Sequence, residues 1–305
     1  MTTTAIALVL ASVVLHAAWN AVAKSRPTFA FFYYSNIVGA ILLLPVVYLH
    51  ADVVWKLPQT VWWFLTFAGM AQAVGGLALM RAYAAADLSV AYPLIRSLGP
   101  VFIVLGSLAL GRQDAISIGC LLGIAAIVVG TATLGLSNMR ALGQRTISGI
   151  GFFFCVSAAL ATMGYTLIDD AGVHEVLNSG ALDQLREAPA RSGLLYASIE
   201  GWFSFFWMSV WLFRKREYRA ELRAYTSRAA IRDAVVVGIG SYASYALVLI
   251  AMLYASDVSY VAGFRQLSIP LGAAIGVFWY GEHIDGMKAF GLSAMLAGLL
   301  AIALT

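Results

Sequence analysis

Charged residues are scarce in this 305-residue sequence: Asp, Glu, Lys and Arg make up 11% of it, whereas 61% of the residues are hydrophobic. A soluble globular domain has about a quarter of its residues charged, so this composition excludes an ordinary soluble protein. It predicts an all-α polytopic membrane protein. The formal charge of +4 is modest and the basic residues lie mostly between apolar runs, so we expect no nucleic-acid partner.

The chain also lacks the motifs of several protein classes. Cys120 and Cys155, the two cysteines, lie inside apolar runs, where cysteine is usually a small core residue. No Walker A sequence, zinc-ligand spacing or nucleophile elbow occurs, so we expect no enzyme, no catalytic residue, no metal and no cofactor. The N-terminus has no positive region, and His16 and Asn20 interrupt the first apolar run, which predicts a retained helix and not a cleaved signal peptide.

Long apolar runs dominate what is present. A helix that spans a bilayer needs about 20 apolar residues, and the sequence divides into ten such runs. We predict membrane-spanning helices at 4–23, 29–49, 60–84, 88–110, 115–136, 148–168, 193–213, 230–254, 258–280 and 284–304. No separate soluble domain is left over.

Loop charge predicts the orientation of these helices. The longest connections are an acidic loop from Asp169 to Ser192 and a basic loop from Arg214 to Ala229. Cytoplasmic loops collect Lys and Arg, so we predict that the basic loop is inside and both termini are outside. We expect the protein in the inner (plasma) membrane as a multi-pass monomer or homodimer, with the lipid bilayer as its surroundings.

One segment, residues 77–111, recurs later in the chain. Eight of its residues (Leu77, Leu79, Ala85, Asp87, Ser89, Pro100, Gly106 and Gly111) match Leu247, Leu249, Ala255, Asp257, Ser259, Pro270, Gly276 and Gly281 at one constant offset. Five helices per half is an odd number, so two related halves must cross the membrane in opposite directions. We predict two inverted five-helix repeats, residues 1–140 and 141–305, with a substrate site at their interface.

Three arginines lie within predicted spans. Charge inside hydrocarbon is costly, so an intramembrane arginine is a candidate site residue. Arg96 lies about 12 Å of helix rise from the start of its run, and Arg265 enters from the opposite face. Arg81 is near the end of its run, and two interpretations stay open: it lines a cavity, or its guanidinium reaches the membrane surface.

Polar residues also follow one face of the first predicted helix, where Ser12, His16, Asn20 and Lys24 recur every four residues beside Trp19. This stripe is either a cavity wall or a structural contact with a neighbouring helix. His16 is a proton-coupling candidate because histidine titrates near neutral pH. Glu200 is a second one if its helix begins near Gly193; a later start would place it at the membrane interface.

The sequence around several of these residues resembles that of a known protein family. The sequence from His16 to Asn20, followed by Lys24, resembles the first helix of EamA-type members of the drug/metabolite transporter superfamily, as do Ala82–Pro100, its repeat Ala255–Pro270, and Gly281–Glu282. The His-Ala-Ala-Trp-Asn version is also similar to a subgroup associated with phosphonate utilisation. Many family members carry their positive loops as though the N-terminus were inside, and this chain does not.

The resemblance implies a ten-helix carrier with a central cavity lined by the first, third, fourth, sixth, eighth and ninth helices. Carried onto this sequence, it implies that the substrate contacts are Trp19, Asn20, Arg81, Tyr92, Arg96, Tyr165, Tyr242 and Arg265. We expect a secondary transporter, an exporter or exchanger, for a small anionic or zwitterionic metabolite. The alternative is a non-transporting membrane scaffold or sensor that binds a partner through the basic loop; a membrane-embedded enzyme ranks third.

Overall fold

The computed structural model describes residues 2–23, 28–85, 88–141, 149–179, 188–271 and 285–304. Its long helices in the first part of the chain are α1 (Thr3–Ala23), α2 (Phe29–Leu49), α4 (Gln59–Ala85), α5 (Leu88–Ala109) and α6 (Ile118–Ala141). Those in the second part are α7 (Gly149–Asn178), α9 (Pro189–Arg214), α11 (Arg228–Met252) and α14 (Gly286–Ala303). The shorter elements are α3 (Ala51–Val54), η1 (Gln113–Ala115), α10 (Arg216–Ala224), α12 (Val258–Phe264) and η3 (Arg265–Leu267).

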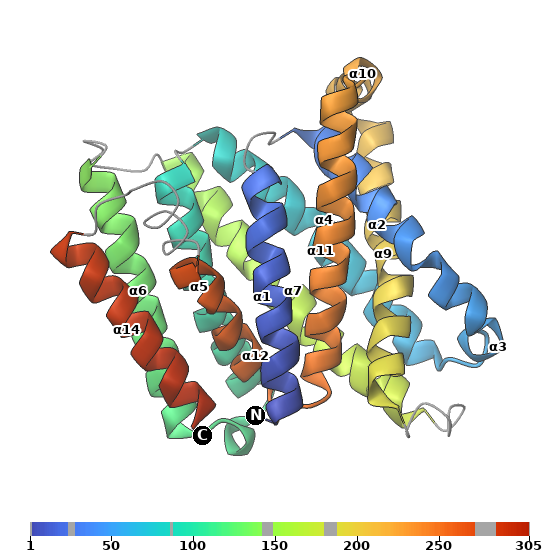
Figure 1. The fold of residues 1–305 in the computed structure, drawn as a ribbon. Coiled ribbons are helices and arrows are strands. Elements are labelled where there is room, and N and C mark those ends of the chain that lie inside the picture. Colours follow the sequence, from blue (N-terminus) through green and yellow to red (C-terminus); the bar gives the residue numbers. More distant parts are fainter. Residues whose placement is uncertain are drawn as a thin grey trace.

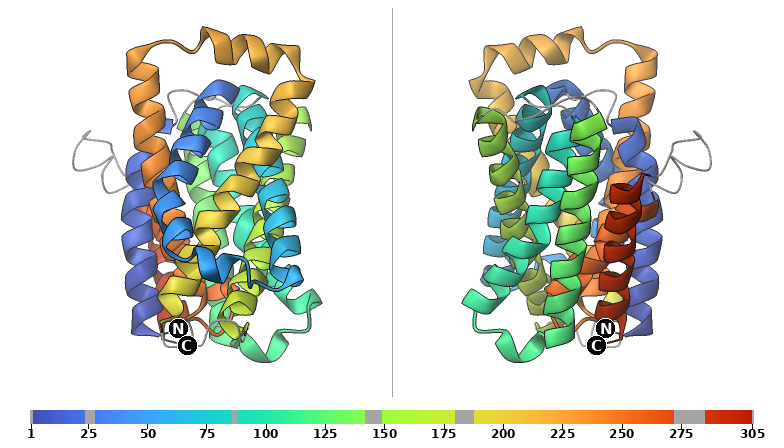
Figure 2. Two further views of the ribbon diagram at one scale, coloured as in Figure 1. Left: turned by 90° about the vertical axis from the view of Figure 1, so that its right-hand side faces the viewer. Right: turned by 90° about the vertical axis from the view of Figure 1, so that its left-hand side faces the viewer.

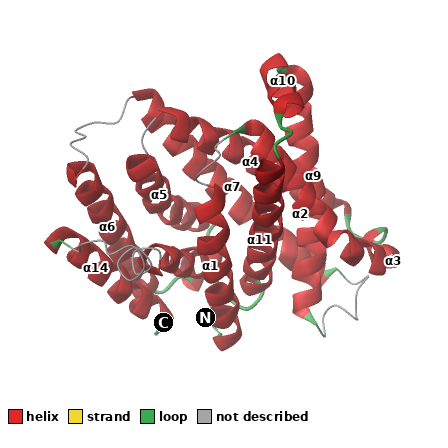
Figure 3. Cartoon of the chain, turned by 45° about the horizontal axis from the view of Figure 1, so that its top comes forward, coloured by secondary structure: helices red, strands yellow, loops and turns green. Residues whose placement is uncertain are grey.

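Every regular element in the described ranges is a helix, which confirms the all-α class (Figure 3). Six helices of the described part are long and apolar enough to cross a membrane: α2, α4, α6 up to Ser137, α7, α11 and α14. They indicate a helical membrane protein. The helix α9 is long enough to cross as well, but its Trp and Ser residues and Glu200 lower its hydropathy.

Most predicted runs coincide with helices to within a few residues, but the acidic loop expected from Asp169 to Ser192 is wrong. The helix α7 continues to Asn178, so Asp169 and Asp170 lie within it, and both are buried. Each aspartate has partners on other helices, which compensates for its loss of hydration. The next helix begins at Pro189, four residues earlier than expected.

The helices form one bundle whose neighbours are far apart in sequence. The N-terminal helix α1 lies against α11, α4 against α7, and α6 against α14 (Figure 1). Both termini lie at one end of the bundle, and α10 crosses the opposite end (Figure 2). The Tyr218 ring of α10 stacks on Phe29 with ring centroids 4.1 Å apart, which holds this basic helix against α2.

Glycines allow α6 and α14 to approach until their backbones touch. A Cβ atom added to Gly123 would lie 2.6 Å from the carbonyl oxygen of Gly298. One added to Gly130, two turns later, would overlap the carbonyl oxygen of Gly291. Small residues are common where membrane helices pack this closely, because lipid provides no hydrophobic force between them.

We therefore expect Gly130→Ala to destabilise the protein, since the two backbones must separate to admit one methyl group. Overpacking of this kind costs about 1–3 kcal/mol. Gly149→Ala is the matched control, because a Cβ atom there would meet nothing within 4 Å. Thermal melting of purified protein in detergent would check the pair. Equal melting temperatures for Gly130→Ala and the wild type would contradict the close packing.

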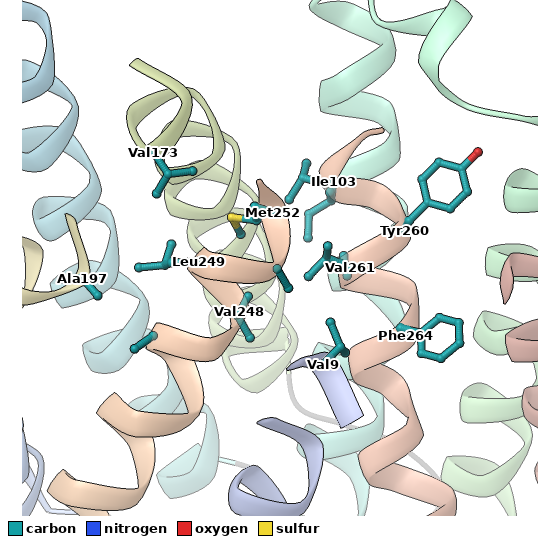
Figure 4. Packing of buried hydrophobic residues seen from close by; sticks show 14 of the residues in the cluster. Val9, Ile103, Val173, Ala197, Val248, Leu249, Met252, Tyr260, Val261 and Phe264 are labelled. Carbon is teal, nitrogen blue, oxygen red and sulfur yellow. The ribbon is translucent and has the colours of Figure 1, made fainter. Parts of the chain in front are cut away.

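The end of the bundle near the termini is filled by a hydrophobic core (Figure 4). Side chains from several helices meet there, including Val9, Val173, Leu249, Met252 and Val261. All five are buried, with at most 1% of their surface exposed. This packed region closes the bundle on the side of the termini.

Candidate functional site

A cavity of about 320 Å³ lies among α1, α4, α5, α7, α9, α11 and the α12–η3 segment. It reaches toward α10, because Tyr83 lines it and Arg81, two residues earlier, contacts α10. Seven residues predicted from the sequence line this cavity: His16, Trp19, Arg96, Tyr165, Glu200, Tyr242 and Arg265. The structure therefore brings most of the predicted site together.

The two arginines meet at a 3₁₀ turn in the ninth predicted span. The helix α12 ends at Phe264, the 3₁₀ turn covers Arg265–Leu267, and residues 268–271 are helical again, so the described part of the run expected over 258–280 is helical with one tightened turn. Arg96 Nη2 donates hydrogen bonds to the carbonyl oxygen of Arg265, at 3.2 Å, and to Ser268 Oγ, at 2.5 Å. A 3₁₀ turn inside a longer helix often marks a functional hinge, and two residues of this turn, Arg265 and Gln266, line the cavity.

Arg265 itself lies over an aromatic ring. Its guanidinium carbon is 5.6 Å from the centroid of the Tyr245 ring, a cation–π distance. Tyr165 packs edge-on against the same ring, with centroids 5.8 Å apart. Among the described residues, no carboxylate lies within ion-pair distance of Arg265. The guanidinium therefore lines the cavity with an aromatic partner and without an acidic one.

The polar stripe of α1 forms part of the cavity wall. His16 and Trp19 both line it, and their rings pack at right angles with centroids 4.8 Å apart. Gly240 on α11 accommodates this contact, because a Cβ atom there would lie 2.8 Å from the Cβ of Trp19. The cavity-wall interpretation of the stripe is thus the correct one for these two residues. The side chain of Asn20 lies outside the described part of the structure.

Tyr242 lines the cavity from a position fixed by two glycines. A Cβ atom on Gly39 or Gly201 would overlap the Tyr242 ring, so the ring lies between the backbones of α2 and α9. Its hydroxyl donates to the carbonyl oxygen of Gly201 at 3.5 Å. We conclude that Tyr242 is held by packing as well as exposed to the cavity.

Two carboxyl groups accompany the arginines, and one was missed by sequence analysis. Glu200 lies about 16 Å of helix rise from the start of α9, is 2% exposed and lines the cavity, so the alternative of a later helix start is wrong. Gln72 on α4 donates to Glu200 Oε1. Asp169 on α7 is fully buried beside it and accepts from Tyr196 at 3.1 Å and from Tyr245 at 2.5 Å.

A second charged cluster lies at the end of the bundle near the termini. Gly111 has a positive φ of 77° and ends α5, which aims Arg112 back toward α7. The Arg112 guanidinium pairs with Asp170, and its Nη1 is 3.7 Å from Asp257 Oδ2. Ser107 and the backbone N–H of Ser259 both donate to Asp257, so this carboxylate also caps α12. The cluster joins α5, α7 and α12 just below the cavity.

Comparisons with known proteins identify the fold alone. No family model and no curated protein matches the chain. Among 28 matching chains of solved structures is one described only as "Crystal structure of protein". It shares 15% sequence identity with this protein over 100% of this chain and 98% of its own, with a TM-score of 0.71. This likeness shows that the arrangement of helices exists in another protein.

The two other residues predicted to contact the substrate are Arg81 and Tyr92. The Arg81 side chain is exposed and lies outside the cavity, so the surface interpretation is the correct one. Its guanidinium is 3.4 Å from the Tyr218 hydroxyl and 5.7 Å from the Phe154 ring centroid, because the last turn of α4 reaches the level of α10. The side chain of Tyr92 lies outside the described residues.

Proposed function

We propose that this protein is a secondary transporter of the inner membrane, an exporter or exchanger, for a small anionic or zwitterionic metabolite with a carboxylate or phosphonate group. One observation carries the proposal: Arg96 and Arg265, from the two halves of the chain, line the same internal cavity. An arginine at membrane depth is costly, so two of them in one cavity favour a site that binds an anion. The cavity volume of about 320 Å³ suits a small solute.

Ten crossings arranged as inverted repeats, residues 1–140 and 141–305, are part of this proposal. A two-fold relation would exchange the first helix with the sixth and the third with the eighth. Observed packing is compatible with this, because α1 lies on α11 as α4 lies on α7. The outermost helices of the two halves, α6 and α14, pack on each other through matching glycine pairs.

The cavity extends toward one end of the bundle and not toward the other, as expected for one state of a transporter that works by alternating access. It extends toward the α10 end, whereas the hydrophobic core and the Arg112 cluster close the end near the termini. Basic residues of 214–228 favour the cytoplasm, which would make this state open toward the inside and place both termini outside. Rearrangement of the two halves around the arginines would then release the solute on the other side.

Exchange in proteoliposomes tests the proposal. The purified protein is reconstituted with an unlabelled probe inside, and uptake of the same labelled probe is measured for lactate, alanine, glutamate and methylphosphonate. We expect saturable exchange of at least one probe and none in protein-free liposomes. Exchange of no probe would contradict this function and favour the alternative, a membrane scaffold or sensor that acts through residues 214–228.

A further inference from the structure

Asp169 on α7 and Glu200 on α9 are neighbours across the interface between these helices, because Tyr196, one helical turn before Glu200, donates a hydrogen bond to Asp169. Ionised carboxylates only accept hydrogen bonds, so contact between two of them requires a proton on one. Both residues are at most 2% exposed, and no described basic side chain lies within ion-pair distance of either. Two buried carboxyl groups this close, with no basic partner in the described residues, favour a proton on one of them.

The surroundings of the pair supply donors from three helices. Tyr196 on α9 and Tyr245 on α11 donate to the two oxygens of Asp169, and Gln72 on α4 donates to Glu200. The charged neighbour on the same helix is Asp170, which pairs with Arg112 on the side away from the cavity. Three further titratable groups lie near the pair: Tyr242 on α11 lines the cavity with Glu200, Tyr165 on α7 packs edge-on against Tyr245, and His174 on α7 lies 3.6 Å from Asp170.

We propose that Asp169 and Glu200 form a proton-binding site, which holds one shared proton while the two carboxyl groups are in contact and releases it through Glu200 into the cavity. The coupling part of this inference rests on the proposed transport function. Glu200 lines the cavity, whereas Asp169 lies behind it. Gln266, 5% exposed, lines the same cavity, and its Oε1 has no hydrogen-bond partner among the described residues. That free acceptor indicates that the cavity takes a ligand or water molecule that donates a hydrogen bond.

A proton fits this site better than a metal cation does. Sodium and similar ions need several oxygen atoms with free lone pairs, but the tyrosines and Gln72 direct hydrogen atoms at the carboxylates. His16, the other candidate from the sequence, is less suitable. It faces Arg96 and Arg265, so a proton there would add a third positive charge to the same cavity.

The charges specify how the proton and the substrate are coupled. With one proton on the pair, the two guanidinium groups balance the remaining carboxylate and one bound monoanion. Without that proton, two carboxylates in contact repel each other and also repel the anion. Tyr245 links the sites directly, because its hydroxyl donates to Asp169 and its ring lies under Arg265. We expect a monoanion and a proton to bind together and to cross in the same direction.

Infrared spectroscopy tests the proton site independently of transport. Wild-type protein titrated with acid and base should show a protonated carboxyl band that is shifted in D₂O. Asp169→Asn and Glu200→Gln should each lose this band, while Glu175→Gln, an acid at the end of the same α7 helix that binds Thr60, should keep it. A band that persists in both Asp169→Asn and Glu200→Gln would overturn the proposal.

Transport measurements distinguish a failure of proton coupling from a failure of the proposed transport function. The probe is the member of the four-probe panel that wild-type protein exchanges fastest. An electroneutral one-to-one step predicts about tenfold accumulation for a gradient of about one pH unit, and this accumulation should be lost in Glu200→Gln but not in the control Glu175→Gln. Wild-type exchange without pH-driven accumulation would overturn the coupling and leave the transport function intact. Absence of all exchange would overturn the transport function, and the infrared band would still decide the proton site.

Discussion

Replacing Arg265 with alanine should reduce exchange of the substrate by about 10- to 100-fold. A hydrogen bond to a charged group contributes about 1.5–3 kcal/mol, and a factor of ten in rate or affinity corresponds to about 1.4 kcal/mol. Arg265 lines the cavity and stacks on Tyr245, so its removal would delete the proposed anion contact without breaking a side-chain hydrogen bond to another described residue. The measurement is initial exchange rate in proteoliposomes at matched protein density.

Arg96→Ala should reduce the exchange rate to a similar degree. Two effects contribute, loss of the proposed anion contact and loss of structural support, and they can be measured separately. Its guanidinium also bonds the carbonyl oxygen of Arg265 and Ser268 Oγ, which supports the 3₁₀ turn after α12. We therefore expect a lower melting temperature for Arg96→Ala and a nearly unchanged one for Arg265→Ala. Arg96→Lys keeps the charge but not the planar donor geometry, so it should restore exchange only in part.

Arg81→Ala is the matched control for both substitutions. This arginine also belongs to a predicted span, but its side chain lies outside the cavity and contacts Tyr218 of α10. Its exchange rate should stay within about twofold of the wild type, as expected for an exposed side chain whose loss costs little. Wild-type rates in both Arg96→Ala and Arg265→Ala would show that the arginines do not bind the substrate.

Helix positions could be predicted from the sequence because spanning runs are long and uninterrupted. The run 29–49 is α2, and 60–84 lies within one residue of α4 at each end. Charged residues caused the errors. Asp169 follows an apolar run and reads as the start of a loop, since its partners Tyr196 and Tyr245 lie 27 and 76 residues away. Side-chain partners supplied by distant helices leave no local signal.

The site residues that the sequence could identify are those whose charge has few structural explanations. Arg96 and Arg265 stand out because a cation within a long apolar run has few structural explanations. Half of the proposed proton site could be recognised: Glu200 was a candidate because its helix could begin near Gly193, whereas Asp169 reads as the start of a loop until α7 is known to continue to Asn178. Gln72 was also missed, since one uncharged amide in a long helix has many interpretations.

The cluster around Arg112 should act as the closure of the bundle at the end near the termini. Arg112 belongs to the first half of the chain, while Asp170 and Asp257 belong to the second, so the cluster ties the halves together. The Asp257 side chain is fully buried and that of Asp170 is 6% exposed. Removing the arginine leaves the buried Asp257 without its cation and leaves Asp170 with the imidazole of His174, 3.6 Å away, as its remaining partner, which strongly disfavours the closed arrangement.

We therefore expect Arg112→Ala to shift the protein toward a state that is open at the termini. The Arg112 side chain is 30% exposed, so we discount the cost of breaking a buried pair to about 2 kcal/mol, a population shift of about 30-fold. A cysteine introduced at Ala197, in a background without Cys120 and Cys155, reports on this shift because Ala197 lines the cavity. An impermeant thiol reagent added on the side of the termini should label it faster in Arg112→Ala.

Arg232→Ala controls for the loss of any ion pair. Arg232 bonds Asp233 at 3.1 Å with 76% of its side chain exposed, and exposed pairs contribute at most about 1 kcal/mol. Its labelling rate should equal that of the wild type, and Arg112→Lys should fall between wild type and Arg112→Ala. If Arg112→Ala and wild type react at the same rate from the side of the termini, the hydrophobic core around Val173 and Met252 closes that end without help from the ion pairs.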